Sequence, residues 1–256
     1  MSDRALQDLV LRALADAPFR ASPAWRERAL ADPARLERFA RFLARHFYFE
    51  RIVHFFKYSR TLTRVTGRSP DAGLRAAAFD ALLPAIVLGS RESAAAVADV
   101  VATHVAAGRR EGIPYLGDLL TYERAMMVAE AGPRIWREMG NGEGGMGKGT
   151  APELVEGTVL LVLTYDLPAV LPKLLAPWTE LPQCPEQPTT LLIARSRHGR
   201  VAVARADAAV ATVVELADGR KTLEDLAREA GLRPAELEAT LAGLTELGAV
   251  RFGTGS

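Results

Sequence analysis

The sequence has little of what metal-binding, redox-active and polyanion-binding proteins usually carry. Its 256 residues include one cysteine, Cys184, and four histidines, and 32 basic residues stand against 31 acidic ones. One cysteine can form neither an internal disulfide nor a thiolate metal cluster, and a net charge of +1 provides no overall attraction to nucleic acid or membranes. The first residues, MSDRALQDLVLRALADAPF, have no uninterrupted apolar stretch, so we expect a cytoplasmic protein without a signal peptide or membrane span.

Helix signals dominate the first half of the chain. Asp32 followed by Pro33 predicts the N-cap and first turn of a helix that runs to Gly67, either as one long helix or as two that kink. Asp71 and Ser90 predict the caps of two further helices, and the stretch IPYLGDLLTYERAMMVAEAG predicts another. These patterns indicate an all-α bundle of five or six helices.

A histidine-containing stripe on the long helix is a candidate metal site. His46, Glu50 and His54 recur every four residues and therefore share one side of a helix. His46 and His54 would lie about 12 Å apart along the axis, because the rise is 1.5 Å per residue, so one ion cannot bind all three. A metalloenzyme using Glu50 and His54 would need ligands from elsewhere, and only His104 and His198 remain among the histidines. We favour a hydrogen-bonded polar stripe and expect no metal in this chain.

The stretch GNGEGGMGKGT resembles a phosphate-binding loop only in part. Such a loop needs a hydroxyl directly after its lysine, but Gly149 occupies that position and Thr150 comes one residue late. The flanks also predict a helix before the stretch, where a buried strand is required. We therefore interpret residues 140–152 as a glycine-rich linker between a helical domain, 1–139, and a second domain, 153–256.

Strand patterns replace helix patterns beyond the linker. The apolar run from Thr158 to Asp166 predicts a buried strand, and Pro168 predicts the start of a short helix. Two alternating stretches, Thr189–Arg195 and Arg200–Arg205, flank the turn sequence SRHG and predict a hairpin.

Three helix signals follow the hairpin. One helix is expected from Ala208, a second after the cap Thr222, and a third from Pro234. The closing sequence AVRF is expected to add a terminal strand. The predicted fold class is therefore α+β, with a helical N-terminal domain and a small winged-helix domain built from the hairpin and three helices.

A winged helix suggests DNA binding, and the charge of its last helix shows whether that function fits. The last helix carries Arg233 against Glu236, Glu238 and Glu246, and this negative balance opposes a phosphate backbone. The basic residues are on the hairpin instead: Arg195, Arg197, His198, Arg200 and Arg205. They either protect a sheet edge from aggregation or accept an extended acidic peptide by strand addition.

The C-terminal sequence RVAVARADAAVATVVELADGRKTLEDLAREAGLRPAELEATLAGLTELGAVRF resembles the RiPP recognition element. This PqqD-like winged helix binds the leader peptides of ribosomally made, modified natural products. The resemblance covers about the last 70 residues, and its marks are the helix ending in L-x-D-G-x-x-T-L-x-D-L and the last helix ending in L-x-x-L-G. The minimal element has no obvious counterpart of the strand at Thr158–Asp166.

The helical half is similar to the partner proteins of multinuclear non-haem iron oxidative enzymes, the DUF692 family, through the stretch YLGDLLTYERAMMVAE. This resemblance implies a non-catalytic subunit without a cofactor, because the iron belongs to the partner enzyme. The leader would be captured as an added strand. The implied peptide groove consists of Arg200, Val201, Ala202, Val203, Ala204 and Arg205 facing Leu237, Leu241, Gly243 and Leu244. The implied enzyme-facing residues are His54, Tyr58, Tyr115, Tyr122 and Glu123.

We therefore expect a peptide-binding adaptor that brings a precursor peptide to an iron enzyme as a heterodimer or larger complex, without nucleic acid or membrane as a partner. The alternative is a winged-helix transcriptional regulator, for which DNA binding would depend steeply on salt.

Overall fold

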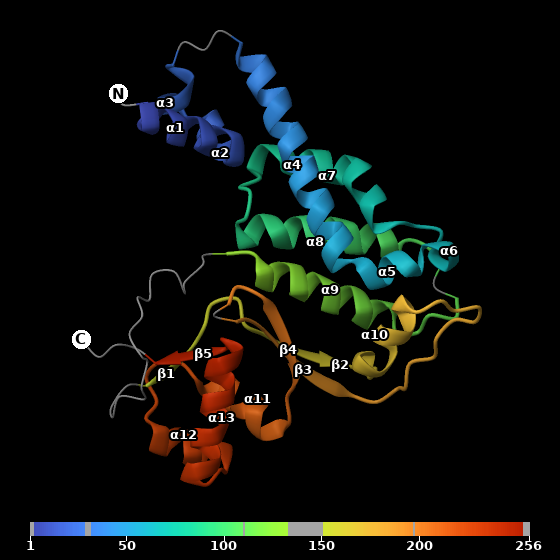
Figure 1. Ribbon diagram of the computed structural model, residues 1–256, viewed down its shortest axis with the longest axis vertical. Coiled ribbons are helices and arrows are strands. Elements are labelled where there is room, and N and C mark those ends of the chain that lie inside the picture. Colours follow the sequence, from blue (N-terminus) through green and yellow to red (C-terminus); the bar gives the residue numbers. More distant parts are fainter. Residues whose placement is uncertain (1–2, 29–31, 110, 133–150, 197, 253–256) are drawn as a thin grey trace. The chain divides into compact units, whose positions relative to one another are not determined.

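The computed structural model describes residues 3–28, 32–109, 111–132, 151–196 and 198–252 (Figure 1). Contacts divide the chain into two compact units. Unit 1 comprises Met1–Val128 with Leu171–Pro182, and unit 2 comprises Ala129–Val170 with Gln183–Ser256. The helices and small antiparallel sheets confirm the α+β class. The glycine-rich stretch lies almost wholly outside the described residues.

Unit 1 is helical. Its long helix α4, Pro33–Phe55, lies among shorter ones, and the helix α9, Leu116–Glu130, runs across the boundary into unit 2. Large side chains that are at most 1% exposed form its core, among them Tyr48, Phe56, Phe79 and Leu119. The other elements are α1 Asp3–Ala15, α2 Ala17–Ala21, α3 Pro23–Arg26, α5 Lys57–Thr61, α6 Thr63–Thr66, η1 Pro70–Arg75, α7 Ala77–Leu82, η2 Leu83–Ala85 and α8 Arg91–Ala106.

Two of the three predicted caps in this unit are confirmed. The Asp32 carboxylate accepts the Arg35 N–H at 2.8 Å and begins α4, and the Ser90 hydroxyl accepts the Ser93 N–H at 3.2 Å and begins α8. The predicted cap at Asp71 is wrong, because this residue lies inside the 3₁₀ helix η1.

The long helix ends earlier than predicted. It stops at Phe55, and α5 and α6 follow as separate short helices before Gly67. The N–H groups of Tyr58 and Ser59 donate to the Glu123 carboxylate at 2.8 and 3.0 Å instead of continuing the helical ladder. A side chain from 64 residues away therefore breaks the helix at this point.

Unit 2 contains two antiparallel sheets (Figure 1). Strands β2 (Val159–Leu163), β3 (Thr189–Arg195) and β4 (Val201–Arg205) form one in the order β2-β3-β4. Strands β1 (Pro152–Leu154) and β5 (Val250–Phe252) form the other, so the predicted terminal strand is confirmed.

The three predicted C-terminal helices are confirmed as α11 (Ala208–Leu216), α12 (Leu223–Ala230) and α13 (Pro234–Leu247), and the short helix as α10 (Leu167–Leu175). Helices α11, α12 and α13 pack on one face of the β2-β3-β4 sheet through one hydrophobic core. The buried members of this core are Leu192, Ala194, Ala206, Val213, Val214, Ala217, Leu226, Ala227, Leu237, Leu241, Leu244, Ala249 and Val250.

None of the described helices is long and apolar enough to cross a lipid bilayer.

Candidate functional site

Strand β4 forms one edge of the three-stranded sheet. It pairs with β3 from Leu191↔Arg205 to Arg195↔Val201, and no described strand pairs with its other side. The outer side of β4 is therefore open to a further strand.

The ends of the β3–β4 ladder show which backbone groups of β4 face outward. The Ser196 N–H donates to the Arg200 carbonyl at 2.8 Å, and the Ala206 N–H donates to the Thr190 carbonyl at 2.9 Å. Hydrogen-bonded and non-hydrogen-bonded pairs alternate along an antiparallel ladder. The even-numbered residues of β4 consequently bond to β3, and the odd-numbered ones direct their N–H and C=O groups away from the sheet.

Three residues therefore supply the free backbone groups of this edge: Val201, Val203 and Arg205. Their side chains lie on the sheet face opposite the helices, and that of Val203 is 36% exposed. Ala202 and Ala204 lie on the helix-facing side, because their cross-strand partners on β3 belong to the core. An added strand would thus find six backbone groups on one side of β4.

Two of the predicted hairpin arginines are engaged within the protein, and Arg197 lies outside the described residues. The Arg205 guanidinium is already paired, with Nη2 2.6 Å from Oδ1 of Asp166. The Arg195 Nη1 donates to the Gly132 carbonyl at 3.2 Å. Arg200 is exposed and has no ion pair among the described residues, so it is the arginine of β4's edge that remains available to an acidic ligand.

The predicted groove wall on α13 is wrong in its apolar part. Leu237, Leu241 and Leu244 are at most 2% exposed and belong to the core, so they cannot also face a peptide. Gly243 is exposed, and a Cβ atom built on it would meet nothing within 4 Å. Ala239 and Ala242 are exposed near Gly243 on α13, and the exposed Glu246 follows three residues after it.

The acidic character of α13 is confirmed in the described residues. Arg233 donates to Glu236 from its Nε at 2.9 Å, so the single arginine at the start of this helix is neutralised. Glu238 and Glu246 are exposed. This helix presents net negative charge, which disfavours a DNA-reading role.

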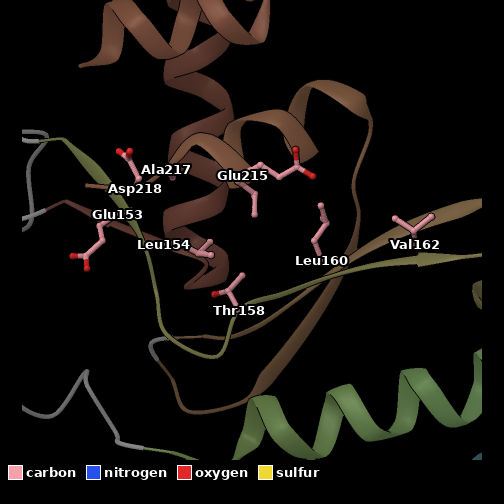
Figure 2. A pocket seen from close by; sticks show the side chains of 9 residues that line it. Glu153, Leu154, Thr158, Leu160, Val162, Glu215, Ala217 and Asp218 are labelled. Carbon is pink, nitrogen blue, oxygen red and sulfur yellow. The ribbon is translucent and has the colours of Figure 1, made fainter. Parts of the chain in front are cut away.

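A hollow that was not predicted from the sequence lies on the opposite edge of the sheet. It has a volume of about 570 Å³ and lies between strand β2 and helix α11, close to β1 (Figure 2). The apolar run that contains β2 was predicted to be buried, but Val162 is 77% exposed. Exposure of a β-branched residue on an edge strand is a signal that only coordinates reveal.

The predicted enzyme-facing residues do not form one surface. Tyr115, Tyr122 and Glu123 are at most 6% exposed, and the Tyr115 hydroxyl donates to the Pro182 carbonyl at 2.8 Å. Tyr122 and Glu123 lie in α9, and Tyr115 directly precedes this helix. All three side chains are buried structural residues and are not available for contact with a partner. His54 is exposed and Tyr58 is half-buried, so only these two remain candidates.

The Glu123 carboxyl is the most perturbed titratable group described. Burial raises its pKa to about 8, although the N–H groups of Tyr58 and Ser59 favour the charged form. Its second oxygen, Oε2, is buried without a hydrogen-bond partner among the described residues. The group is fully buried and holds the start of α5, so its chemistry concerns stability.

Part of the aromatic surface of α4 is exposed. Phe39, Phe42 and Phe49 are 50, 60 and 43% exposed, opposite the buried side of the helix. The rings of Phe39 and Phe42 stack with centroids 6.4 Å apart, and Phe42 stacks on His46 at 6.1 Å. Leu6, Val10 and Leu11 of α1 are also exposed, and Val10 and Phe39 line a common hollow. We call this set the α1–α4 face.

The candidate metal stripe is an exposed part of α4. His46 Nε2 lies 3.3 Å from Glu50 Oε1, and both side chains are more than half exposed. No group of three histidine, cysteine, aspartate or glutamate side chains within the described ranges is arranged to hold a metal ion.

Comparison with known proteins adds no assignment: no family model matches the sequence, and no curated protein is significantly similar to it. The geometry of the two sheet edges and of the α1–α4 face therefore carries the functional argument.

Proposed function

We propose that this protein is a non-catalytic adaptor that binds the leader of a precursor peptide and presents it to a multinuclear non-haem iron enzyme. The observation that carries the proposal is the open outer side of β4, where three residues offer N–H and C=O groups to an added strand. In this proposal, the sheet and helices of unit 2 act as a winged helix of the RiPP-recognition-element type.

We expect the charges at the β4 edge and on α13 to set the register of the leader. Arg200 directly precedes β4, whereas Glu238 and Glu246 are exposed on α13. An acidic residue of the leader would therefore lie near Arg200, and its residues toward α13 would be small or apolar. The exposed Gly243 leaves room for a close approach of the peptide to this helix.

The α1–α4 face is the part of unit 1 best suited to the enzyme. Contiguous exposed apolar side chains mark interaction surfaces, and the most exposed large apolar side chains of the two helices are Leu11, Phe42, Phe39 and Leu6. Arg35 and Arg38 are exposed beside them. We place the enzyme here, with an apolar contact surface bordered by acidic residues.

Substitution of Val203 by proline tests leader binding. Proline removes one outward N–H and leaves the bonds between β3 and β4 intact, so leader affinity should fall about tenfold. The matched control is Val203→Thr, which keeps the N–H and the branched shape and should bind within about threefold of the parent. Isothermal calorimetry with synthetic leader peptides of candidate precursors provides the measurement.

Two results would contradict the proposal. One is unchanged leader affinity in a Val203→Pro variant whose circular dichroism and melting match the parent. The other is binding of upstream DNA at low salt with a steep salt dependence, since this would indicate a transcriptional regulator.

A further inference from the structure

A second groove lies along the outer side of β2, on the sheet edge opposite β4. Figure 2 shows it between this strand and helix α11, with the side chains of Leu154, Thr158 and Leu160 in its middle and Val162 at one end. Its volume of about 570 Å³ falls within the range of ligand sites. The leader assigned to β4 would not occupy it.

The backbone of β2 is arranged to receive a strand on this side. Because the even-numbered residues of β3 bond to β4, its odd-numbered residues bond to β2, at the pairs Leu191↔Leu161 and Ile193↔Val159. The N–H and C=O groups of Leu160 and Val162 therefore point outward, and no described strand pairs with them.

The side chains of the same two residues face the groove. Leu160 packs against the core between sheet and helices, whereas Val162 is 77% exposed, the highest value among the exposed large apolar side chains. Leu154, Val214 and Ala217 complete the apolar lining. Backbone hydrogen-bonding groups and an apolar floor thus meet along one line, which is the arrangement that strand addition requires.

The charged side chains that line the groove are all acidic: Glu153, Glu215 and Asp218. Arg251 neutralises Glu153, with 3.0 Å between Nη2 and Oε2. Glu215 is exposed and has no ion pair among the described residues.

Asp218 also stays negative. Its carboxylate accepts the N–H groups of Arg220 and Lys221, which lower its pKa. The Lys221 ammonium is paired with Glu229, so it does not fully cancel this charge. The groove therefore presents an apolar floor under a negative rim, the opposite charge to Arg200 at the β4 edge.

We propose that this groove binds an extended, lysine- or arginine-bearing segment of a different protein chain, which adds to β2 as a fourth strand. Apolar residues of the segment lie over Leu160 and Val162, and a basic residue lies near Glu215 and Asp218. The sheet would then have two binding edges that select segments of opposite charge.

Two labelled peptides test this on the full chain: GKVTVKG, and GEVTVEG as its charge-reversed match. By fluorescence anisotropy, the lysine peptide should bind saturably and about tenfold more tightly than the glutamate peptide, and this difference should shrink in 0.5 M salt. Glu215→Gln should weaken the lysine peptide about threefold.

Backbone pairing is tested with Val162→Pro against Val162→Thr. Proline removes an outward N–H and should weaken the lysine peptide about tenfold, whereas threonine should stay within about threefold. Val203→Pro, on the other edge, should leave this binding unchanged. Failure here would not affect the leader-binding result at β4.

Three outcomes would overturn the proposal. Equal affinity for the two peptides would remove the charge argument, and unchanged affinity in a folded Val162→Pro variant would remove the strand-addition argument. Concentration-dependent dimerisation that Val162→Pro abolishes in sedimentation experiments would assign the edge to a second copy of this chain.

Discussion

Replacement of Gly248 by alanine is expected to destabilise unit 2 by roughly 3 kcal/mol or more. Gly248 ends helix α13 in the left-handed region, with φ of 80°, where a side chain is strained. A Cβ atom at this position would lie 2.3 Å from the carbonyl oxygen of Arg195 and 3.0 Å from Cα of Ser196. Both neighbours are backbone atoms at the end of β3, so they cannot move aside without disturbing the hairpin.

Gly243 provides a matched control on the same helix. An alanine there meets nothing within 4 Å and improves helix propensity, so it should stabilise the unit by about 0.5–1 kcal/mol. Chemical unfolding and amide hydrogen exchange of the β3 and α13 peptides would measure both. Equal stability of Gly248→Ala and the parent would show that the contact of the helix end with the hairpin is not as described. Loss of leader affinity in Gly243→Ala would support a peptide close to α13.

Unit 1 is expected to lose stability as pH rises from about 5 to 8, on the order of 4 kcal/mol, through Glu123. Burial raises the pKa of this carboxyl from 4.5 to about 8 in the folded protein. The stabilisation that this carboxyl gives to the folded state is fully present below its pKa in the unfolded chain. As pH rises above 4.5 the unfolded chain releases the proton while the folded chain keeps it, and the loss is complete once pH passes the folded pKa.

Glu123→Gln isolates this effect. The amide oxygen can still accept the N–H groups of Tyr58 and Ser59, but the group no longer titrates, so the slope of stability against pH should disappear. Glu123→Leu leaves both N–H groups unpaired and should destabilise unit 1 by about 3 kcal/mol at every pH. Urea unfolding at several pH values, followed by exchange at the α5 amides, gives the measurement. The same slope in parent and Glu123→Gln would contradict the assignment.

Local sequence signals predicted the elements that depend on a few neighbouring residues. The caps Asp32, Ser90 and Thr222 all begin helices, and the hairpin around SRHG forms with β4 starting one residue later than predicted. These features need only side chains within three or four positions of the backbone groups that they satisfy. Pro33 and Pro234 correctly predicted the first residues of α4 and α13 for the same reason.

The remaining elements depend on contacts between distant residues. The end of α4 is set by Glu123, and no sequence pattern near Phe55 predicts this contact. Strand β1, only three residues long, exists because β5 pairs with it. Periodicity in α13 correctly showed an apolar side but not what covers it, so Leu237, Leu241 and Leu244 were assigned to a groove although they fill the core. The β4 edge could be predicted because the alternation of residue types along the sequence locates strands. The β2 groove could not be predicted, because it depends on the exposure of side chains such as Val162 in the folded protein.

The pairing of β1 with β5 also bears on how this chain folds during synthesis. Pro152 pairs with Phe252, so β1 cannot form its sheet until β5 has been synthesised. At about 5–20 residues per second, the ribosome needs roughly 5–20 s to make the intervening 100 residues. The β2-β3-β4 sheet, with its two unpaired edges, can form during that interval, before β1 pairs with β5.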